Sequence, residues 1–180
     1  MNRFVIEGGR PLQGVIRPAG NKNEALPALM ACLLTEEPLT LHRMPRIGDV
    51  QTACDILSDI GVQVERTGPE TLVLDAAKAH GYRPAPALCA QIRASILLLG
   101  PLLSRFGRVE LPLPGGDVIG ARRIDTHWEG IAALGGSLDL DGGLVGSIQQ
   151  IRGTDVYLDE PSVTATENLL LLSVRCEGRT

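Results

Sequence analysis

The sequence has few aromatic residues and no excess of positive charge, and each shortage excludes a class of function. Phe, Trp and Tyr together make up 3% of the 180 residues, so the base-stacking surfaces of single-stranded nucleic-acid-binding proteins are not expected. The formal net charge of −4 at pH 7 argues against a broad nucleic-acid-binding face. Local pairs such as Arg122-Arg123 are still able to hold a small anion.

The chain also lacks the apolar runs that membrane association requires. No run reaches the roughly 18 residues that a membrane-spanning helix needs. The first ten residues contain Arg3, Glu7 and two glycines, unlike the apolar core of a signal peptide. We therefore expect a soluble cytoplasmic protein without a membrane partner. With 44% hydrophobic residues, the chain can form one large domain or one and a fraction.

The cysteines are few and scattered, which argues against a disulfide framework and against a metal site. Cys32, Cys54, Cys89 and Cys176 form no C-x-x-C pair and have no histidine at ligand-like spacing. Cys32, Cys54 and Cys176 fall within apolar helical patterns, in which a thiol behaves as a small hydrophobic side chain. We therefore expect neither a disulfide nor a metal or other cofactor.

The sequence does contain an internal repeat of roughly 75 residues, built around an amphipathic helix that ends at glycine. The first such helix runs from Asp49 to the residue before Gly61, and the second from Asp125 to the residue before Gly135-Gly136. In both, the opening aspartate is predicted to cap the helix. Two strands are predicted to follow each helix. They are 62–65 and 72–75 in the first unit, and 137–140 and 144–148, joined by a turn at 141–143, in the second.

Each unit also contains a helix that is apolar on nearly every side, which predicts burial on every side. A kink is expected at Gly100-Pro101 in the second of these helices. Thr164 and Glu167 have the spacing of a capping box that opens the third. The three helices are 23–34, 90–105 and 164–176.

The units follow the pattern βαβαββ, with buried helices inside and amphipathic helices and short strands around them. The chain holds two units and part of a third, which begins near Thr154 and stops at Thr180. An array that stops within a unit leaves an apolar face uncovered. We therefore predict an α/β fold and interpret the chain as a fragment of a longer protein.

Two segments that open buried helices are candidate anion sites. The segment 20–24 contains Lys22 and joins a predicted strand at 14–17 to a helix N-terminus, where backbone N–H groups suit a phosphate or carboxylate. The segment 162–166 precedes the third buried helix in the same way. The alternative in each place is structural: a turn with an asparagine cap and a solvated lysine in the first, and simple N-capping in the second.

The connection 112–125 is long and irregular, and such loops are usually functional or disordered. Its apolar content argues against disorder. Asp117 offers acid–base chemistry, and the guanidinium groups of Arg122 and Arg123 can each bind phosphate oxygens in pairs. An ordinary surface loop with arginine–aspartate pairing is the alternative. Arg93, which opens the second buried helix, is either near the surface or paired, and structural and ligand-binding roles fit it equally well.

Four stretches together resemble the UDP-N-acetylglucosamine 1-carboxyvinyltransferase family of enolpyruvyl transferases. They are G-N-K-N-E-A-L-P at 20–27, R-A-S-I-L-L-L-G-P-L at 93–102, P-G-G-D-V-I-G-A-R-R-I-D at 114–125 and D-E-P-S-V-T-A-T-E-N at 159–168. The resemblance implies an inside-out α/β barrel, in which two domains of three repeats each have helices inside. Residues 21–180 would form an incomplete first domain, and residues 1–20 would add a strand to a second domain that is otherwise missing.

The resemblance also implies roles for individual residues. Lys22, Asn23 and Arg122 would bind phosphoenolpyruvate. Asp117 stands where most members have a cysteine that donates a proton, and some members have aspartate there. Position 160 is Glu, where many members have Lys, which puts that contact with the nucleotide in doubt. The UDP-sugar would be contacted by Arg93, Arg122, Arg123, Ile124, Asp125, Thr126, Ser162, Val163, Thr164 and Ala165.

In the reaction of this family, the 3-hydroxyl of the sugar adds to the enol ether carbon, the methylene carbon is protonated, and phosphate leaves. The general base and further arginines would lie in the missing C-terminal half, so residues 1–180 would not complete the site alone. The sister enzyme that uses shikimate 3-phosphate is one alternative, although it typically has Lys-Ser where this chain has Lys22-Asn23. A non-catalytic module that retains the fold is the other.

Overall fold

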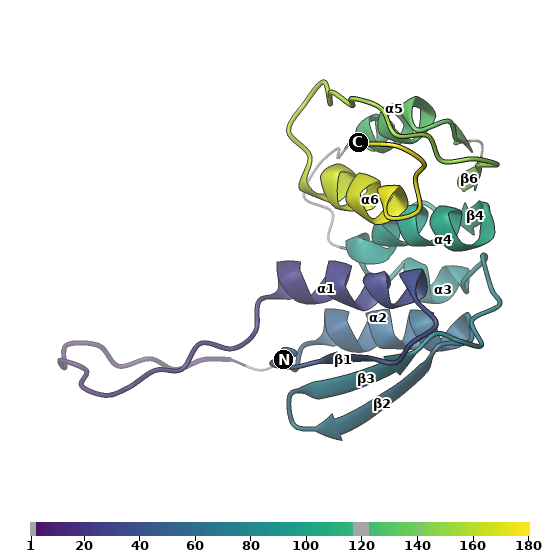
Figure 1. Ribbon diagram of the computed structural model, residues 1–180. Coiled ribbons are helices and arrows are strands. Elements are labelled where there is room, and N and C mark those ends of the chain that lie inside the picture. The colour runs from purple at the N-terminus through teal and green to yellow at the C-terminus, as the bar shows by residue number, and fades with distance from the viewer. Residues whose placement is uncertain (1–2, 117–122, 141) are drawn as a thin grey trace.

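The computed structural model describes residues 3–116, 123–140 and 142–180. Figure 1 shows their helices stacked one above another, with one small sheet below them and strands of the other at their right-hand side. The first unit contains α1 (Lys22–Met30), η1 (Ala31–Leu34), β1 (Leu39–Leu41), α2 (Gly48–Asp59), β2 (Gln63–Gly68) and β3 (Thr71–Asp75). The second contains α3 (Pro86–Cys89), η2 (Arg93–Leu98), α4 (Leu99–Phe106), β4 (Arg108–Leu111), α5 (Asp125–Ala133), β5 (Ser137–Asp139) and β6 (Leu144–Ser147). The last helix is α6 (Val163–Ser173).

The two sheets have the same topology, so the described residues form a repeat as predicted, but neither unit has the opening strand of the predicted βαβαββ pattern. Each has three antiparallel strands, in the orders β1-β3-β2 and β4-β6-β5. In both, the last strand of the unit lies in the middle and pairs with the strand on either side of the amphipathic helix. Leu72 and Leu74 of β3 point into the core because side chains alternate along a strand.

Within the described residues, the two sheets stay separate and do not close into a barrel. After β6 the chain forms α6 and an isolated bridge between Arg152 and Glu177, and no further ladder. The prediction that α6 is buried on all sides is wrong for these residues, since Leu170 is 66% exposed and Val174 62% exposed. Nothing in the described part of the chain packs over this face.

The strand predicted at 14–17 is also wrong for the described residues. Residues 3–18 form a long loop that runs out from the body of the molecule and back to α1, and they have no strand assignment (Figure 1). A β-strand needs a neighbour to bond its N–H and C=O groups, and none lies beside this segment. Its apolar side chains are almost fully exposed: Phe4, Val5, Ile6, Leu12, Val15 and Ile16.

The helix predicted over 90–105 begins only at Arg93 and changes type within its length, because a side chain enters it from α6. The Asn168 side chain accepts a hydrogen bond from the Gly100 N–H at 2.7 Å and donates one to the Ile96 carbonyl at 2.9 Å. These are the two groups that would bond each other in a continuous α-helix. The helix is therefore 3₁₀ up to Leu98 and α from Leu99, and Pro101 falls in the first turn of α4, where its missing N–H costs little.

The predicted caps need correction at three helices. Asp49 and Asp125 lie within the first turns of α2 and α5, and the N-cap residues are isoleucines without a side-chain cap bond. The capping box predicted at Thr164 does not open α6. Ser162 does, since its Oγ accepts the Ala165 N–H at 3.3 Å. The helical periodicity was read correctly, but it does not show which polar residue turns back to the backbone.

The hydrophobic core is continuous through both units, and Arg105 joins them at one end. Its guanidinium donates to the carbonyl oxygens of Leu33, Thr35 and Ala76 at 3.0, 3.1 and 2.8 Å. These bonds give partners to the backbone carbonyl groups at the end of η1 and just after β3. Burial raises the pKa of the Cys32 thiol to about 12, despite the opposing charge of Arg105, so this cysteine is an unreactive core residue. Among the described residues, no helix is long and apolar enough to cross a membrane.

The close contact between α4 and α6 predicts a cost for a single methyl group at Gly100. A Cβ there would collide with the backbone carbonyl of Asn168, and overpacking of this kind costs about 1–3 kcal/mol. Gly100→Ala should therefore lower the free energy of unfolding, measured by urea denaturation. Gly48→Ala is the matched control, because it opens α2 with nothing within 4 Å of the added carbon. Equal stabilities of the two variants would show that the α4–α6 contact is not tight.

Candidate functional site

A cavity of about 280 Å³ lies where the first turns of four helices meet. These first turns belong to α1, α2, η2 and α6, which come from all three units of the chain. Figure 1 shows α1, α2 and α6 stacked with their axes roughly aligned. The cavity is lined by Lys22, Asn23, Leu26, Pro27, Asp49, Arg93, Ala94, Leu97, Val163, Thr164 and Glu167.

The field at this cavity favours negative charge. The N-terminal N–H groups of a helix have no partner within it, and the helix dipole adds a partial positive charge at that end. Here α1, α2 and α6 direct such ends at one space, and Lys22 and Arg93 add two full charges. Asp49 and Glu167 partly offset them. Burial raises the pKa of Glu167 above its usual value.

The sequence of the segment 20–24 explains how Lys22 is held. A Cβ at Gly20 would collide with the Arg43 carbonyl, so only glycine lets the chain pass at this point. Asn21 then caps α1, because its Oδ1 accepts the Asn23 N–H at 2.7 Å. Lys22, the first residue of the helix, forms an ion pair with Asp49 of α2 across the cavity. The structural alternative predicted a solvated lysine, whereas Lys22 is held in an ion pair.

Behind the α6 wall lies a buried polar network that the sequence analysis missed. The ring of His127, on α5, contacts Thr164 Oγ1 through Nε2 at 3.1 Å and Asn168 Nδ2 through Nδ1 at 3.0 Å. Asn168 also bonds Gly100 and Ile96 on the opposite side. One signal was available: an asparagine inside an otherwise apolar helix needs buried partners.

The surroundings of His127 keep its ring neutral. Burial, and secondarily the positive charge of Arg93, lower the pKa of His127 to about 4. The amide of Asn168 acts in the same direction, since its NH₂ faces Nδ1 and a protonated ring would place a second N–H against it. The imidazole is therefore a neutral hydrogen-bonding group at physiological pH.

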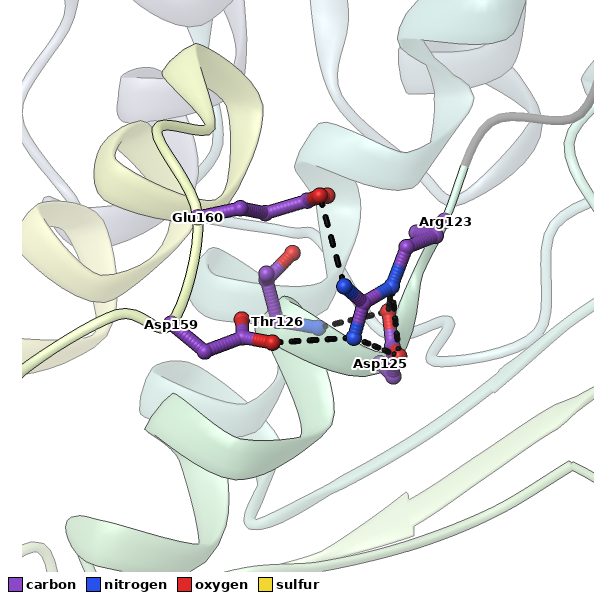
Figure 2. Close-up of polar contacts among 5 residues, drawn as sticks. All are labelled: Arg123, Asp125, Thr126, Asp159 and Glu160. Atoms are coloured by element: carbon purple, nitrogen blue, oxygen red, sulfur yellow. Dashed lines mark hydrogen bonds and ion pairs between the residues drawn. The ribbon is translucent and has the colours of Figure 1, made fainter.

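A second cluster, shown in Figure 2, gathers three carboxylates around Arg123. Its guanidinium donates to Asp125 Oδ2 from Nε at 2.8 Å, to Asp159 Oδ2 from Nη2 at 2.9 Å and to Glu160 Oε2 from Nη1 at 3.4 Å. The hydrogen bond from Arg123 holds the pKa of Asp125 below its usual range. Arg123–Asp125 pairing is the structural alternative that the sequence left open.

The structure brings five of the predicted site residues to the cavity, which are Lys22, Asn23, Arg93, Val163 and Thr164. Four other predicted residues do not line the cavity, two of them at the start of α6 and two at the start of α5. Ser162 caps α6, Ala165 and Thr126 are fully buried, and Ile124 caps α5. Asp117 and Arg122 lie outside the described residues.

The beginning of the loop 112–125 lies against η2. The Gly116 N–H donates to the Ala90 carbonyl at 3.2 Å, and a Cβ at Gly116 would crowd the Arg93 backbone nitrogen at 2.8 Å. Gly116 also has a φ of 86°, which favours glycine. The two glycines before Asp117 thus fix where this loop leaves the wall that carries Arg93.

The fold is that of an enolpyruvyl transferase. The enolpyruvyl transferase NikO from Streptomyces tendae aligns over 95% of this chain and 40% of its own, with a TM-score of 0.79 and 22% identity. EPSP synthase from Acinetobacter baumannii aligns over 89% of this chain and 38% of its own, with a TM-score of 0.69 and 17% identity. The chain belongs to the EPSP synthase (3-phosphoshikimate 1-carboxyvinyltransferase) family, whose model matches residues 6–180.

Curated relatives within this family share a different and more specific name, UDP-N-acetylglucosamine 1-carboxyvinyltransferase. The relative from Bradyrhizobium diazoefficiens is 48% identical over 99% of this chain, and that from Treponema pallidum is 46% identical over 100%. The chain spans 41% and 42% of their respective lengths. The resemblance noted from the four motifs is confirmed.

The buried His127 predicts a loss of stability in mild acid. Its pKa is about 4 in the folded chain and about 6.5 in an unfolded chain, so the unfolded state binds the proton more readily between these values. The free energy of unfolding should fall as the pH falls from about 6.5 to about 4, by about 3 kcal/mol in total at ~1.36 kcal/mol per unit. Urea denaturation at neutral pH and at about pH 5 measures the larger part of this loss, about 2 kcal/mol.

His127→Gln removes the titrating group and should remove this component of the pH dependence. The matched control is His42→Gln, because His42 is exposed and its replacement leaves the buried ring in place. If the wild type and His127→Gln lose the same stability between the two pH values, His127 is not the group responsible.

Proposed function

We propose that this chain is the N-terminal part of an enzyme that transfers the enolpyruvyl group of phosphoenolpyruvate to the 3-hydroxyl of UDP-N-acetylglucosamine, with release of phosphate. This is a cytoplasmic step of peptidoglycan synthesis. The observation that carries the proposal is the cavity at four helix N-termini, which holds Lys22 and Arg93. Relatives that are 46–48% identical over this whole region carry the name of that activity.

The chemistry of the two substrates suits this cavity. Phosphoenolpyruvate carries a phosphate and a carboxylate, and a UDP-sugar carries a diphosphate, so both need several hydrogen-bond donors and positive charges close together. Helix N-termini provide donors at fixed positions, and lysine and arginine provide charge. When phosphoenolpyruvate binds, its phosphate competes with Asp49 for Lys22, which already faces the cavity.

We assign Lys22, Asn23 and Arg122 to phosphoenolpyruvate, and Arg93 with residues 122–126 and 162–165 to the UDP-sugar. Val163 and Thr164 support the second assignment, because they line the same cavity as Arg93. Arg123 already bonds three carboxylates, so it would contact the nucleotide only by giving up one of them. Glu160 is one of those three carboxylates, so the acidic residue at this position would help to hold Arg123 in place.

The proposed fold of the whole protein is a pair of inside-out α/β barrels with three units in each. Residues 21–180 supply two units and the buried helix of a third, and the exposed face of α6 at Leu170 and Val174 is the place for the rest of that unit. Residues 1–20 belong to the second domain in this proposal. Their nearly complete exposure of apolar side chains supports it, since such a segment needs a partner.

We propose that Asp117 donates the proton to the methylene carbon of phosphoenolpyruvate. A free aspartate has a pKa of about 3.9 and is a poor acid at neutral pH. Beside a bound phosphate and carboxylate, repulsion between like charges would raise the pKa of Asp117 towards the useful range. Gly115 and Gly116 place the preceding backbone against the Arg93 wall, so the loop starts next to the cavity.

Two other functions compete with this one. The family description names 3-phosphoshikimate 1-carboxyvinyltransferase, whose acceptor is also an anion that the cavity can hold. The chain carries Lys22-Asn23 at the first helix, and the 46–48% identity to the UDP-sugar enzymes favours the nucleotide-sugar. A non-catalytic module with the same fold would show no ligand effect, even with the remaining half supplied.

The first test compares ligands on the 180-residue chain. UDP-N-acetylglucosamine should raise its melting temperature more than shikimate 3-phosphate does at the same concentration, since only the former also has the nucleotide and sugar groups that the proposed contacts recognise. Arg93→Ala should weaken UDP-N-acetylglucosamine binding roughly 10- to 100-fold, the usual scale for a lost charged hydrogen bond. Arg66→Ala is the matched control, because Arg66 is an exposed arginine on β2. A preference for shikimate 3-phosphate would contradict the proposal.

The second test concerns the proton donor in a complete enzyme that contains this chain and its C-terminal half. Asp117→Asn keeps the shape of the side chain and removes the proton, so it should lose most of the phosphate release from phosphoenolpyruvate. Asp117→Cys should retain turnover, because a thiol can also deliver a proton. The 180-residue chain alone should release none. Full activity in Asp117→Asn would refute the proton-donor role.

A further inference from the structure

We propose that Asn168 and His127 are positioning residues: Asn168 holds the η2 wall and the α6 wall of the cavity in register, and His127, on α5, holds the cavity residue Thr164 through the same buried series of hydrogen bonds. Neither residue lines the cavity, and both are buried, His127 with 1% and Asn168 with 0% exposure. The chain of bonds ends at Thr164, which does line it. The inference rests on the proposed function only for the identity of the ligand.

The orientation of the Asn168 amide is fixed by backbone groups of the second unit. Its Oδ1 must face the Gly100 N–H, which donates at 2.7 Å, and its Nδ2 must face the Ile96 carbonyl, which accepts at 2.9 Å. A flipped amide would place its NH₂ group against the Gly100 N–H, donor against donor, and its oxygen against the Ile96 carbonyl, acceptor against acceptor. One N–H of the amide therefore remains for the His127 ring, and it can only be donated.

The tautomer of His127 follows from this donation. Its Nδ1 accepts from Asn168 Nδ2 at 3.0 Å and so carries no proton. The proton of the neutral ring is then on Nε2, which donates to Thr164 Oγ1 at 3.1 Å. Gly100 and Ile96 thus fix the Asn168 amide, the amide fixes the tautomer of His127, and the ring donates to Thr164 at the cavity wall.

The geometry of the helices makes this series act on both walls. Ile96 lies about one turn after Arg93, and Asn168 lies about one turn after Thr164. A bond between the later turns therefore sets the distance between the first turns, where the ligand groups are. The backbones also touch nearby, since a Cβ at Gly100 would meet the Asn168 carbonyl. Because the two backbones are in contact, the hydrogen-bonded side chains cannot shift without moving the helices.

Two substitutions separate the two ends of the series. His127→Asn keeps a carbonyl near the position of Nδ1, so it can still accept from Asn168, but it is too short to reach Thr164. Asn168→Leu has a similar volume and removes every bond, which leaves the Gly100 N–H and the Ile96 carbonyl without this partner. The matched control is Ser173→Ala, which removes a hydrogen bond to the Leu169 carbonyl at the other end of the same helix.

The experiment uses the 180-residue chain and three readouts. Imidazole nitrogen resonances report the tautomer of His127, amide hydrogen exchange reports the first turn of α6, and a titration with inorganic phosphate reports the cavity. The wild type should show the Nε2–H tautomer. His127→Asn should keep protection of the Gly100 amide, lose it at Ala165 and Thr166, and bind phosphate roughly tenfold more weakly.

Asn168→Leu should lose protection at Gly100 as well, and Ser173→Ala should match the wild type at Ala165 and in phosphate affinity. An Nδ1–H tautomer in the wild type would overturn the inference. So would a His127→Asn variant whose exchange at Ala165 and whose phosphate affinity equal those of the wild type. If the wild type binds phosphate but not UDP-N-acetylglucosamine, the proposed function fails and the positioning role still stands or falls by these readouts.

Discussion

The arrangement of this molecule depends on where its buried helices begin. A helix surrounded by apolar side chains still has N–H groups at its first turn that no residue of the helix can bond. Here the apolar helices of three successive units, α1, η2–α4 and α6, all begin at one cavity, and α2 begins there too. The repeat therefore gathers donors that a single unit could not, and a ligand with several negative charges satisfies them.

Much of the fold follows from the sequence because periodicity is a local property. The repeat, the amphipathic helices before Gly61 and Gly135, and both strand pairs were predicted from spacing alone, and the structure confirms them. Lys22 and Arg93, which line the cavity, were singled out because each opens a predicted buried helix, although the sequence left a structural role open for both. Positions at helix starts can be identified in a sequence without knowing how the helices pack.

The errors arose where a partner from elsewhere in the chain decides the structure. The helix at 90–105 looks continuous by its apolar pattern, and it is broken because Asn168, 68 residues after Gly100, bonds two of its backbone groups. The strand at 14–17 fails for the opposite reason, since no neighbour lies beside it. His127 was passed over because its partners lie on another helix, 37 and 41 residues away.

The most direct test of the central claim is to map where UDP-N-acetylglucosamine binds, by amide chemical-shift changes in the labelled 180-residue chain. The account predicts that the largest changes occur together at the first turns of the converging helices, at Asn23, Ala94 and Thr164. Changes confined to the exposed cluster around Arg123, with these three amides unmoved, would contradict it.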